Sequence, residues 1–328
     1  MAEQAGFVPH LIGSSGETLR EAFGKALASL ASRYPSLVVL DTDVAGGTGT
    51  HHFRRAHPDR FIQLGIAEQN MVGVAAGMAL AGCLPVASTF AVFALRTIEQ
   101  VRQSIAYPHL NVKLAASHPG LDAGPDGASA QALEDLAAFR AIPGMTVVSP
   151  ADPIEMAKAV PVILEYDGPV YLRTGRSAAR VIFDESYVFE LGRGRVIRDG
   201  SDVTLVACGV EVARALDAAD LLGRDGVAAR VVNMSTIKPI DEALIVRCAR
   251  ETGAFVTAED HNILGGLGGA VAETLARTTP APVELVGVRD VFGESGEADE
   301  LAEKYGLAGP SIADAARRAI ARKRGGSR

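Results

Sequence analysis

Residues 61–80 read FIQLGIAEQNMVGVAAGMAL. The apolar run at 61–64 predicts a buried strand, and the stretch at 67–80 predicts a helix rich in small residues. A strand that leads at once into a helix is the building unit of α/β domains with parallel sheets. Glu68 stands at the junction, where partial shielding from water would raise the pKa of a carboxylate. The alternative is an ordinary acidic residue that favours the positive end of the helix dipole.

Similar strand and helix patterns fill two blocks of the chain, residues 12–180 and 194–324. The first helix is predicted to follow a capping box of Ser14 and Glu17. We expect strands at 37–40, 61–64, 85–89, 112–116, 146–149, 169–173, 203–207, 229–232, 255–258 and 283–288. We expect further helices at 99–107, 132–141, 153–164, 210–222, 240–251, 268–277 and 306–324. The pattern predicts an α/β fold of two domains, each with a parallel-type sheet flanked by helices.

The composition is that of a globular protein: of 328 residues, 48% are hydrophobic and 22% are charged. The net charge of −7 argues against nucleic acid as the main partner. No apolar run is long enough to span a membrane, and the first residues, MAEQAGFVPHLIGSSGETLR, do not resemble a secretory signal. Three widely spaced cysteines exclude a disulfide framework: Cys83, Cys208 and Cys248. We therefore expect a cytoplasmic protein with no membrane partner.

Three motifs that could bind a cofactor or a metal have simpler interpretations. Residues 266–271 resemble a dinucleotide-binding loop only loosely, because the last glycine is missing, and a tight loop that opens a helix is favoured. Asp41 and Asp43 at a strand end favour turn capping over cation binding. Three histidines lack nearby acids, which favours a surface turn over a metal site: His51, His52 and His57. We expect no metal ligands in this chain.

Two stretches at strand ends are candidates for binding a small molecule. Phe90 and Phe93 are three residues apart after a strand, and such aromatic residues either fill a core or hold a flat ring. The loop at 118–127 contains His118 and two aspartates between an expected strand and an expected helix. Loops at the carboxyl ends of strands build the sites of α/β proteins, so a functional and a purely structural interpretation both stay open here.

Taken together, these stretches resemble the transketolase family. The resemblance covers about residues 15–320, in order and in spacing. Its motifs are His57-Pro58-Asp59-Arg60-Phe61, Ile66-Ala67-Glu68-Gln69-Asn70-Met71, Ser88-Thr89-Phe90-Ala91-Val92-Phe93, Asp126-Gly127, Ala132-Leu133-Glu134-Asp135-Leu136, Arg173-Thr174-Gly175-Arg176, Ile237-Lys238-Pro239-Ile240-Asp241 and Ala258-Glu259-Asp260-His261.

The resemblance implies a pyrimidine-binding domain, a transketolase C-terminal domain and thiamine diphosphate as the cofactor. Glu68 would be catalytic, because it faces the pyrimidine ring nitrogen and shares a proton with it. The other implied cofactor-binding residues are Phe90, Phe93 and Asp43. The implied substrate-binding residues, of which His118 is also catalytic, are Arg20, His118, Asp126 and Arg176. Two positions depart from the family: Gly47 replaces a phosphate-binding Ser, and Ala130 replaces a His or Gln.

One part of a transketolase is missing from this sequence. Family members bind the cofactor diphosphate through Mg²⁺ or Ca²⁺ on an N-terminal domain marked by Gly-Asp-Gly, and this tripeptide occurs nowhere in the chain. The chain therefore resembles the C-terminal subunit of a split transketolase. The implied partner is an N-terminal subunit that holds most of the metal site, with two copies of each chain (α2β2). The implied reaction transfers a two-carbon ketol unit from a ketose phosphate to an aldose phosphate.

Three alternatives remain open at this point. 1-Deoxyxylulose-5-phosphate synthase and the β subunit of a 2-oxo-acid dehydrogenase share the cofactor and the two-domain arrangement. The motifs at 66–71 and 132–135 favour transketolase over both. A non-catalytic scaffold or regulatory subunit is the alternative of another class, because a fold does not by itself imply an activity. Five retained residues argue against a scaffold: Glu68, Phe93, Arg20, His118 and Arg176.

Overall fold

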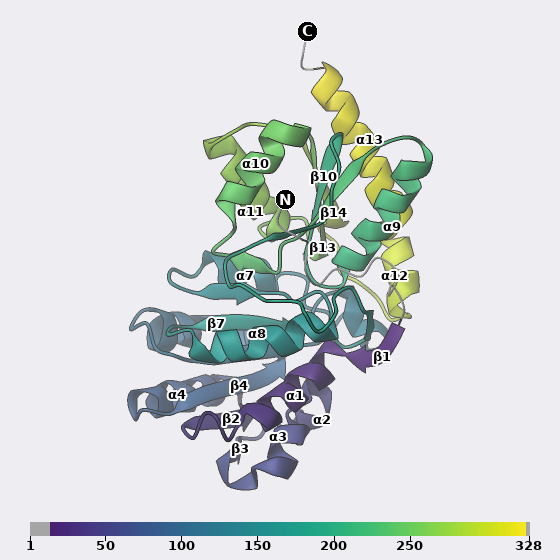
Figure 1. Ribbon diagram of the computed structural model, residues 1–328. Helices are drawn as coiled ribbons and strands as arrows, with labels where there is room; N and C mark the ends of the chain where they lie inside the picture. Colours follow the sequence, from purple (N-terminus) through teal and green to yellow (C-terminus); the bar gives the residue numbers. More distant parts are fainter. Residues whose placement is uncertain (1–13, 326–328) are drawn as a thin grey trace.

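The computed structural model describes residues 14–325, with their side chains from residue 16 onward. Figure 1 shows two α/β units stacked one above the other, the purple-to-teal N-terminal half below and the green-to-yellow C-terminal half above. The predicted fold class, parallel-type sheets flanked by helices, is confirmed. Among the described residues, no helix is both long enough and apolar enough to cross a lipid bilayer.

The N-terminal half is built on a seven-stranded sheet with the order β12-β6-β7-β5-β4-β2-β3. Its strands are β2 (Leu37–Asp41), β3 (Phe61–Gln63), β4 (Leu84–Phe90), β5 (Lys113–Ser117), β6 (Thr146–Val148), β7 (Val170–Thr174) and β12 (Thr236–Lys238). Successive side chains enter opposite layers: Val39 packs in one hydrophobic core and Leu40 in the other. Burial on both faces explains why these strands form continuous apolar runs in the sequence.

Helices cover both faces of this sheet. They are α1 (Leu19–Leu30), α2 (Ala45–Thr48), α3 (His51–Ala56), η1 (Pro58–Arg60), α4 (Glu68–Leu80), α5 (Ala91–Ala94), η2 (Leu95–Thr97), α6 (Ile98–Gln100), η3 (Val101–Ala106), η4 (Leu121–Asp126), α7 (Asp135–Ala141) and α8 (Pro153–Glu165). The helices α1 and α8 pack against each other, and α1 also packs against α3.

The C-terminal half has a five-stranded sheet with the order β14-β13-β10-β11-β9. Its strands are β9 (Arg195–Arg198), β10 (Val203–Ala207), β11 (Ala229–Asn233), β13 (Phe255–Asn262) and β14 (Val283–Val288). Its helices are α9 (Glu211–Arg224), α10 (Glu242–Thr252), α11 (Leu267–Arg277), α12 (Ala298–Lys304) and α13 (Gly309–Gly325). Four strands are parallel, and the edge strand β9 is antiparallel to β11.

The predicted capping box of Ser14 and Glu17 is wrong. Both residues lie in β1 (Ser14–Thr18), which pairs antiparallel with β8 (Ala178–Arg180). The helix begins one residue after Thr18, whose hydroxyl accepts a hydrogen bond from the backbone N–H of Glu21 at 3.2 Å. The same Ser/Thr-x-x-Glu pattern therefore occurs twice in succession, and the second copy caps the helix.

Two other elements differ from the prediction. The helix expected at 306–324 is preceded by a separate helix, α12, and itself begins at Gly309. Strand β12 belongs by sequence to the C-terminal half, but it pairs antiparallel with β6 at the edge of the first sheet. The Lys238 ammonium extends this junction by donating hydrogen bonds to the carbonyls of Arg140 and Ile142. The two halves are thus joined by a shared strand as well as by packing.

A buried ion pair lies between the two sheets. Arg173 on β7 donates two hydrogen bonds to the carboxylate of Asp135, and its Nη1 donates to the backbone carbonyl of Asp260 at 3.0 Å. The Tyr171 hydroxyl donates to Asp135 at 2.5 Å. Burial alone would raise the pKa of Asp135, but the Arg173 guanidinium outweighs burial and lowers it. The pair therefore stays ionised inside the protein and links β7, α7 and the second domain.

We predict that Asp135→Leu destabilises the protein by about 3–5 kcal/mol, because Arg173 would remain buried without its counter-charge. Urea unfolding at pH 7 measures the loss. The matched control is Glu165→Leu, which breaks the exposed pair of Arg33 and Glu165 and should cost less than about 1 kcal/mol. A comparable loss in the two variants would contradict the role assigned to the buried pair.

Candidate active site

The predicted substrate residues meet at the carboxyl edge of the first sheet. Phe90, Ser117 and Thr174 end three neighbouring parallel strands and lie level with one another in the pairing register. His118 follows Ser117 directly, and Arg176 lies two residues beyond Thr174. Because parallel strands end at one edge, the sheet delivers these side chains to one place, where α/β proteins commonly bind ligands.

Two guanidinium groups face this edge. Arg20, in the first turn of α1, donates from Nη1 to the carbonyl of Gly47 at 3.1 Å, while its buried Nε has no hydrogen-bond partner. Arg176 lies with Nη2 3.5 Å from Oδ1 of Asp126. Burial lowers the pKa of Arg20, and the nearby charge of Arg176 lowers it further. Two cations held this close, one with a donor left unpaired, are suited to bind an anion such as a phosphate.

His118 is buried beside these arginines and is neutral. Burial, assisted by the charges of Arg20 and Arg176, lowers its pKa to about 3. Its Nδ1 lies 2.9 Å from the Ser117 hydroxyl, which donates to the Gly47 carbonyl at 3.1 Å. The hydroxyl therefore accepts from Nδ1–H, and Nε2 is left as an acceptor. That nitrogen lies 3.6 Å from the Asp126 carboxylate, too far for a hydrogen bond.

Stacked aromatic rings line one wall of the site. The ring of Phe90 lies on His118 with centroids 3.9 Å apart, and it stacks on Phe93 with centroids 5.6 Å apart. A Cβ atom on Gly47 would lie 2.5 Å from the Phe90 ring, which is closer than atoms can approach. The absence of a side chain at Gly47 thus leaves the space that Phe90 occupies. Ala130 lies in the same loop region as His118 and is partly buried.

Glu68 and Phe93 share a neighbour that the sequence analysis missed. Glu68 is the first residue of α4, and its side chain is only 6% exposed. The Arg96 guanidinium lies 3.4 Å from the Glu68 carboxylate and 5.2 Å from the centroid of the Phe93 ring. The three-residue spacing between Phe93 and Arg96, which places them on one helical face, is the signal that could have indicated this contact.

Asp43, the other predicted cofactor residue, is exposed and in the left-handed region, with φ of 70°. It exchanges hydrogen bonds with Gln63 on the edge strand β3: Gln63 accepts from the Asp43 backbone N–H at 2.9 Å. These hydrogen bonds of Asp43 therefore lie at the sheet edge. Asp41 caps the turn as predicted, because its carboxylate accepts hydrogen bonds from the Val44 N–H and from the hydroxyls of Thr48 and Thr50.

Comparison with known proteins agrees with this geometry. Residues 16–181 match the transketolase pyrimidine-binding domain, and residues 192–312 match the transketolase C-terminal domain. The chain belongs to the transketolase family.

The relatives of this chain include proteins of similar length. It is 46% identical over 299 residues to a protein of Methanocaldococcus jannaschii described as a transketolase C-terminal section. That alignment covers 90% of this chain and 94% of the relative. It is 44% identical over 306 residues to the 6-deoxy-6-sulfo-D-fructose transketolase subunit SqwH of Clostridium sp., covering 93% and 95%. A solved split-gene transketolase, an inactive β4 tetramer, is 51% identical, with a TM-score of 0.88 over 94% of this chain and 100% of that chain.

The C-terminal domain holds the loop that carries His118 and Asp126 in place. The two carboxylate oxygens of Asp260 accept hydrogen bonds from the backbone N–H groups of Leu121 and Asp122, at 2.8 and 2.9 Å. The carboxylate of Asp122 in turn accepts from the N–H of Arg176 at 2.7 Å. Asp260 belongs to one of the family motifs, but its role could not be predicted from the sequence because its partners are about 140 residues away.

The neighbouring Glu259 confirms the structural interpretation of the glycine-rich stretch. Its two carboxylate oxygens accept hydrogen bonds from the N–H groups of Leu267 and Gly268 at the start of α11. A Cβ atom on Gly266 would lie 2.0 Å from Oε2 of Glu259. The carboxylate thus fills the position that a dinucleotide phosphate would need at this helix N-terminus.

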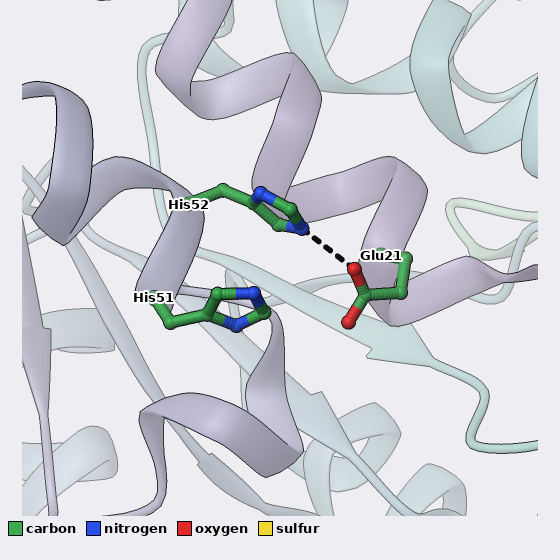
Figure 2. A group of neighbouring side chains, drawn as sticks. All are labelled: Glu21, His51 and His52. Carbon is green, nitrogen blue, oxygen red and sulfur yellow. Dashed lines mark hydrogen bonds and ion pairs between the residues drawn. The ribbon is translucent and has the colours of Figure 1, made fainter.

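The prediction for the three histidines is wrong in two respects. His51 and His52 lie in α3 rather than in a surface turn, and both are partly buried. An acid is nearby: the carboxylate of Glu21 on α1 lies 2.6 Å from Nε2 of His52 (Figure 2). The distance of 31 residues along the chain hid this acid from the sequence analysis. His57 lies apart and bonds to the carbonyl of Ala28.

We predict that the free energy of unfolding falls in mild acid, because His118 takes up a proton in the unfolded chain but not in the folded protein. The pKa of His118 is about 3 in the folded protein and about 6.5 when unfolded, so stability falls as the pH drops below 6.5. His118→Gln should remove about 2 kcal/mol of the stability lost between pH 7 and pH 5, as measured by urea unfolding at both values. His57→Gln is the control. An equal pH dependence in wild type and His118→Gln would contradict the assignment.

Proposed function

We propose that this chain is the C-terminal subunit of a split, thiamine-diphosphate-dependent transketolase. The reaction would move a two-carbon ketol unit from a ketose phosphate to an aldose phosphate. The observation that carries the proposal is the meeting of a cationic pocket and a buried carboxylate-aromatic pair at one sheet edge. The pocket residues are Arg20, His118, Asp126 and Arg176, and the pair is Glu68 and Phe93.

The residues at Glu68 fit the pyrimidine end of the cofactor. Glu68 is buried at a helix N-terminus, where its one ion-pair partner within the described residues is the more exposed guanidinium of Arg96, at 3.4 Å. The Phe93 ring offers a flat apolar face for a second ring. When bound, thiamine diphosphate supplies a carbon that can hold the electron pair released as the sugar carbon–carbon bond breaks. Glu68 would hold the proton shared with the pyrimidine ring, and Phe93 and Phe90 would orient that ring. We also propose that Asp43 contacts the cofactor.

The cationic pocket would bind and orient the sugar. Arg20 and Arg176 would bind the terminal anion through charge-assisted hydrogen bonds. Because His118 stays neutral, its Nε2 can accept a hydrogen bond from a substrate hydroxyl and so orient that hydroxyl for the reaction. Asp126 lies within 3.6 Å of both His118 and Arg176, and it would hold the arginine in place while it faces the sugar hydroxyls.

The proposal includes an N-terminal partner subunit that binds the diphosphate through Mg²⁺ or Ca²⁺, in an α2β2 assembly. Three observations support it. The Gly-Asp-Gly tripeptide is absent from the sequence, and relatives of this length are described as subunits or sections. A split-gene relative forms an inactive β4 tetramer, which agrees with a chain that needs its partner. We also propose a cytoplasmic location. The domains are proposed to span residues 12–180 and 194–324, and this division is supported by the family matches, the first of which ends at residue 181 and the second of which begins at residue 192.

We predict that Glu68→Gln in the reconstituted complex lowers kcat by about 10²–10⁴-fold, because the amide cannot take up a proton. The assay mixes this chain with a purified chain that carries the diphosphate-metal motif, and then measures ketol transfer from ketose phosphates. Glu99→Gln, an exposed change nearby, is the control and should keep full activity. Full activity of Glu68→Gln would revive the scaffold interpretation. Decarboxylation of pyruvate as the donor reaction would instead identify one of the other two enzymes of this cofactor class.

A further inference from the structure

Three potential metal ligands from two helices meet next to the cationic pocket. Glu21 on α1 and the adjacent His51 and His52 on α3 each present one ligand atom, and these atoms lie within 4.8 Å of one another. Figure 2 shows the three side chains pointing toward a common point between the helices. The chain that leads into α3 approaches α1 so closely that a Cβ on Gly24 would lie 2.0 Å from the carbonyl oxygen of Gly49. The cluster is therefore held by rigid backbone packing.

The two imidazoles are oriented for coordination. Nδ1 of His51 lies 3.3 Å from the carbonyl of Ala45, so this nitrogen donates its proton there and Nε2 is free to coordinate. Metal-binding histidines commonly show this backbone anchor, which fixes the tautomer. The ring of His52 lies 4.1 Å from that of His51 between centroids, although adjacent residues of a helix do not normally face each other. A simple pair between His52 and Glu21 does not explain why His51 turns toward the same point.

The third ligand is a carboxylate. One of its oxygens lies 2.6 Å from Nε2 of His52, so a hydrogen bond already holds these two donors side by side. Glu21 is only partly buried, with 30% of its side chain exposed, and His52 with 23%. The site is thus open to ions from solvent while its donors are held in place.

We propose that Glu21, His51 and His52 form a binding site for a divalent transition metal ion of the zinc class, with a fourth coordination position left open. Two imidazole nitrogens and one carboxylate oxygen are a donor set that such ions prefer. Donors bonded at about 2.0–2.1 Å in tetrahedral geometry lie roughly 3.3 Å apart. The present separation of 2.6 Å between His52 and Glu21 would have to widen by less than about 1 Å as the metal replaces the bridging proton.

This site differs from the cofactor metal in chemistry and in place. Mg²⁺ and Ca²⁺ take oxygen ligands, whereas two of these three donors are imidazole nitrogens. The bound ion would fasten the first turn of α1 to α3, directly beside Arg20 of the proposed anion pocket. The metal site does not depend on the transferase activity, and the full chain alone suffices to test it.

The test is zinc binding to the full chain, purified without a polyhistidine tag and freed of metal by a chelator. Isothermal titration with ZnCl₂ should show one site per chain, and His51→Ala and His52→Ala should each weaken it at least about tenfold. His57→Ala is the matched control, because it removes a histidine next to the same helix but outside the cluster. Cobalt in place of zinc should give the visible absorption of a four-coordinate centre with nitrogen ligands.

Two results would overturn the proposal: no saturable zinc binding by the wild-type chain, or equal affinity in wild type, His51→Ala and His52→Ala. Circular dichroism checks that the variants fold. If a variant does not fold, the wild-type cobalt spectrum decides, because a spectrum of six oxygen ligands would contradict the site without any variant. Zinc should also raise the Tm of the wild type and leave that of Glu21→Gln nearly unchanged, since an ion stabilises only the state that binds it.

Discussion

The carboxylate of Asp260 holds the loop on which the proposed substrate pocket depends. It lies in the second domain, yet both of its oxygens accept backbone N–H groups of the first-domain loop that carries His118 and Asp126. The guanidinium of Arg173 secures the strand below by binding the Asp260 carbonyl and the Asp135 carboxylate. The second domain therefore contributes to the pocket by fixing a backbone conformation.

Much of the fold could be predicted because its strands and helices bury apolar faces with regular periodicity. Strands β10 and β14 have the predicted bounds, and the junction at Glu68 is correct within one residue. What failed depends on partners far away in the sequence. Strand β12 is three residues long and is fixed only by its pairing with β6, and β1 is fixed only by β8. The local pattern could not show whether Ser14 or Thr18 caps α1, because Ser14 lies in a strand that is fixed by its pairing with the distant β8.

The residues of the candidate site likewise fall into those that the sequence predicted and those that only the folded structure shows. Arg20, His118, Asp126 and Arg176 were predictable by resemblance, and the structure brings them together because parallel strands end at one edge. The departure at Gly47 has a steric reason that only the structure shows: Phe90 occupies the space of a side chain. The contacts of Arg96 and Glu21 were missed. An arginine three residues after a phenylalanine, or a glutamate 31 residues from a histidine, does not by itself predict a contact; only the folded chain shows that these side chains meet.

Hydrogen–deuterium exchange of the loop amides tests most directly the claim that the second domain fixes the pocket. In the wild type, the amides of Leu121 and Asp122 should exchange slowly, because each donates to Asp260. Asp260→Asn keeps the size but turns one acceptor into a donor, so these amides should exchange at least about tenfold faster. The amides of β5 and β7 should stay protected. Unchanged exchange of the loop, or equal acceleration throughout the first sheet, would contradict this account.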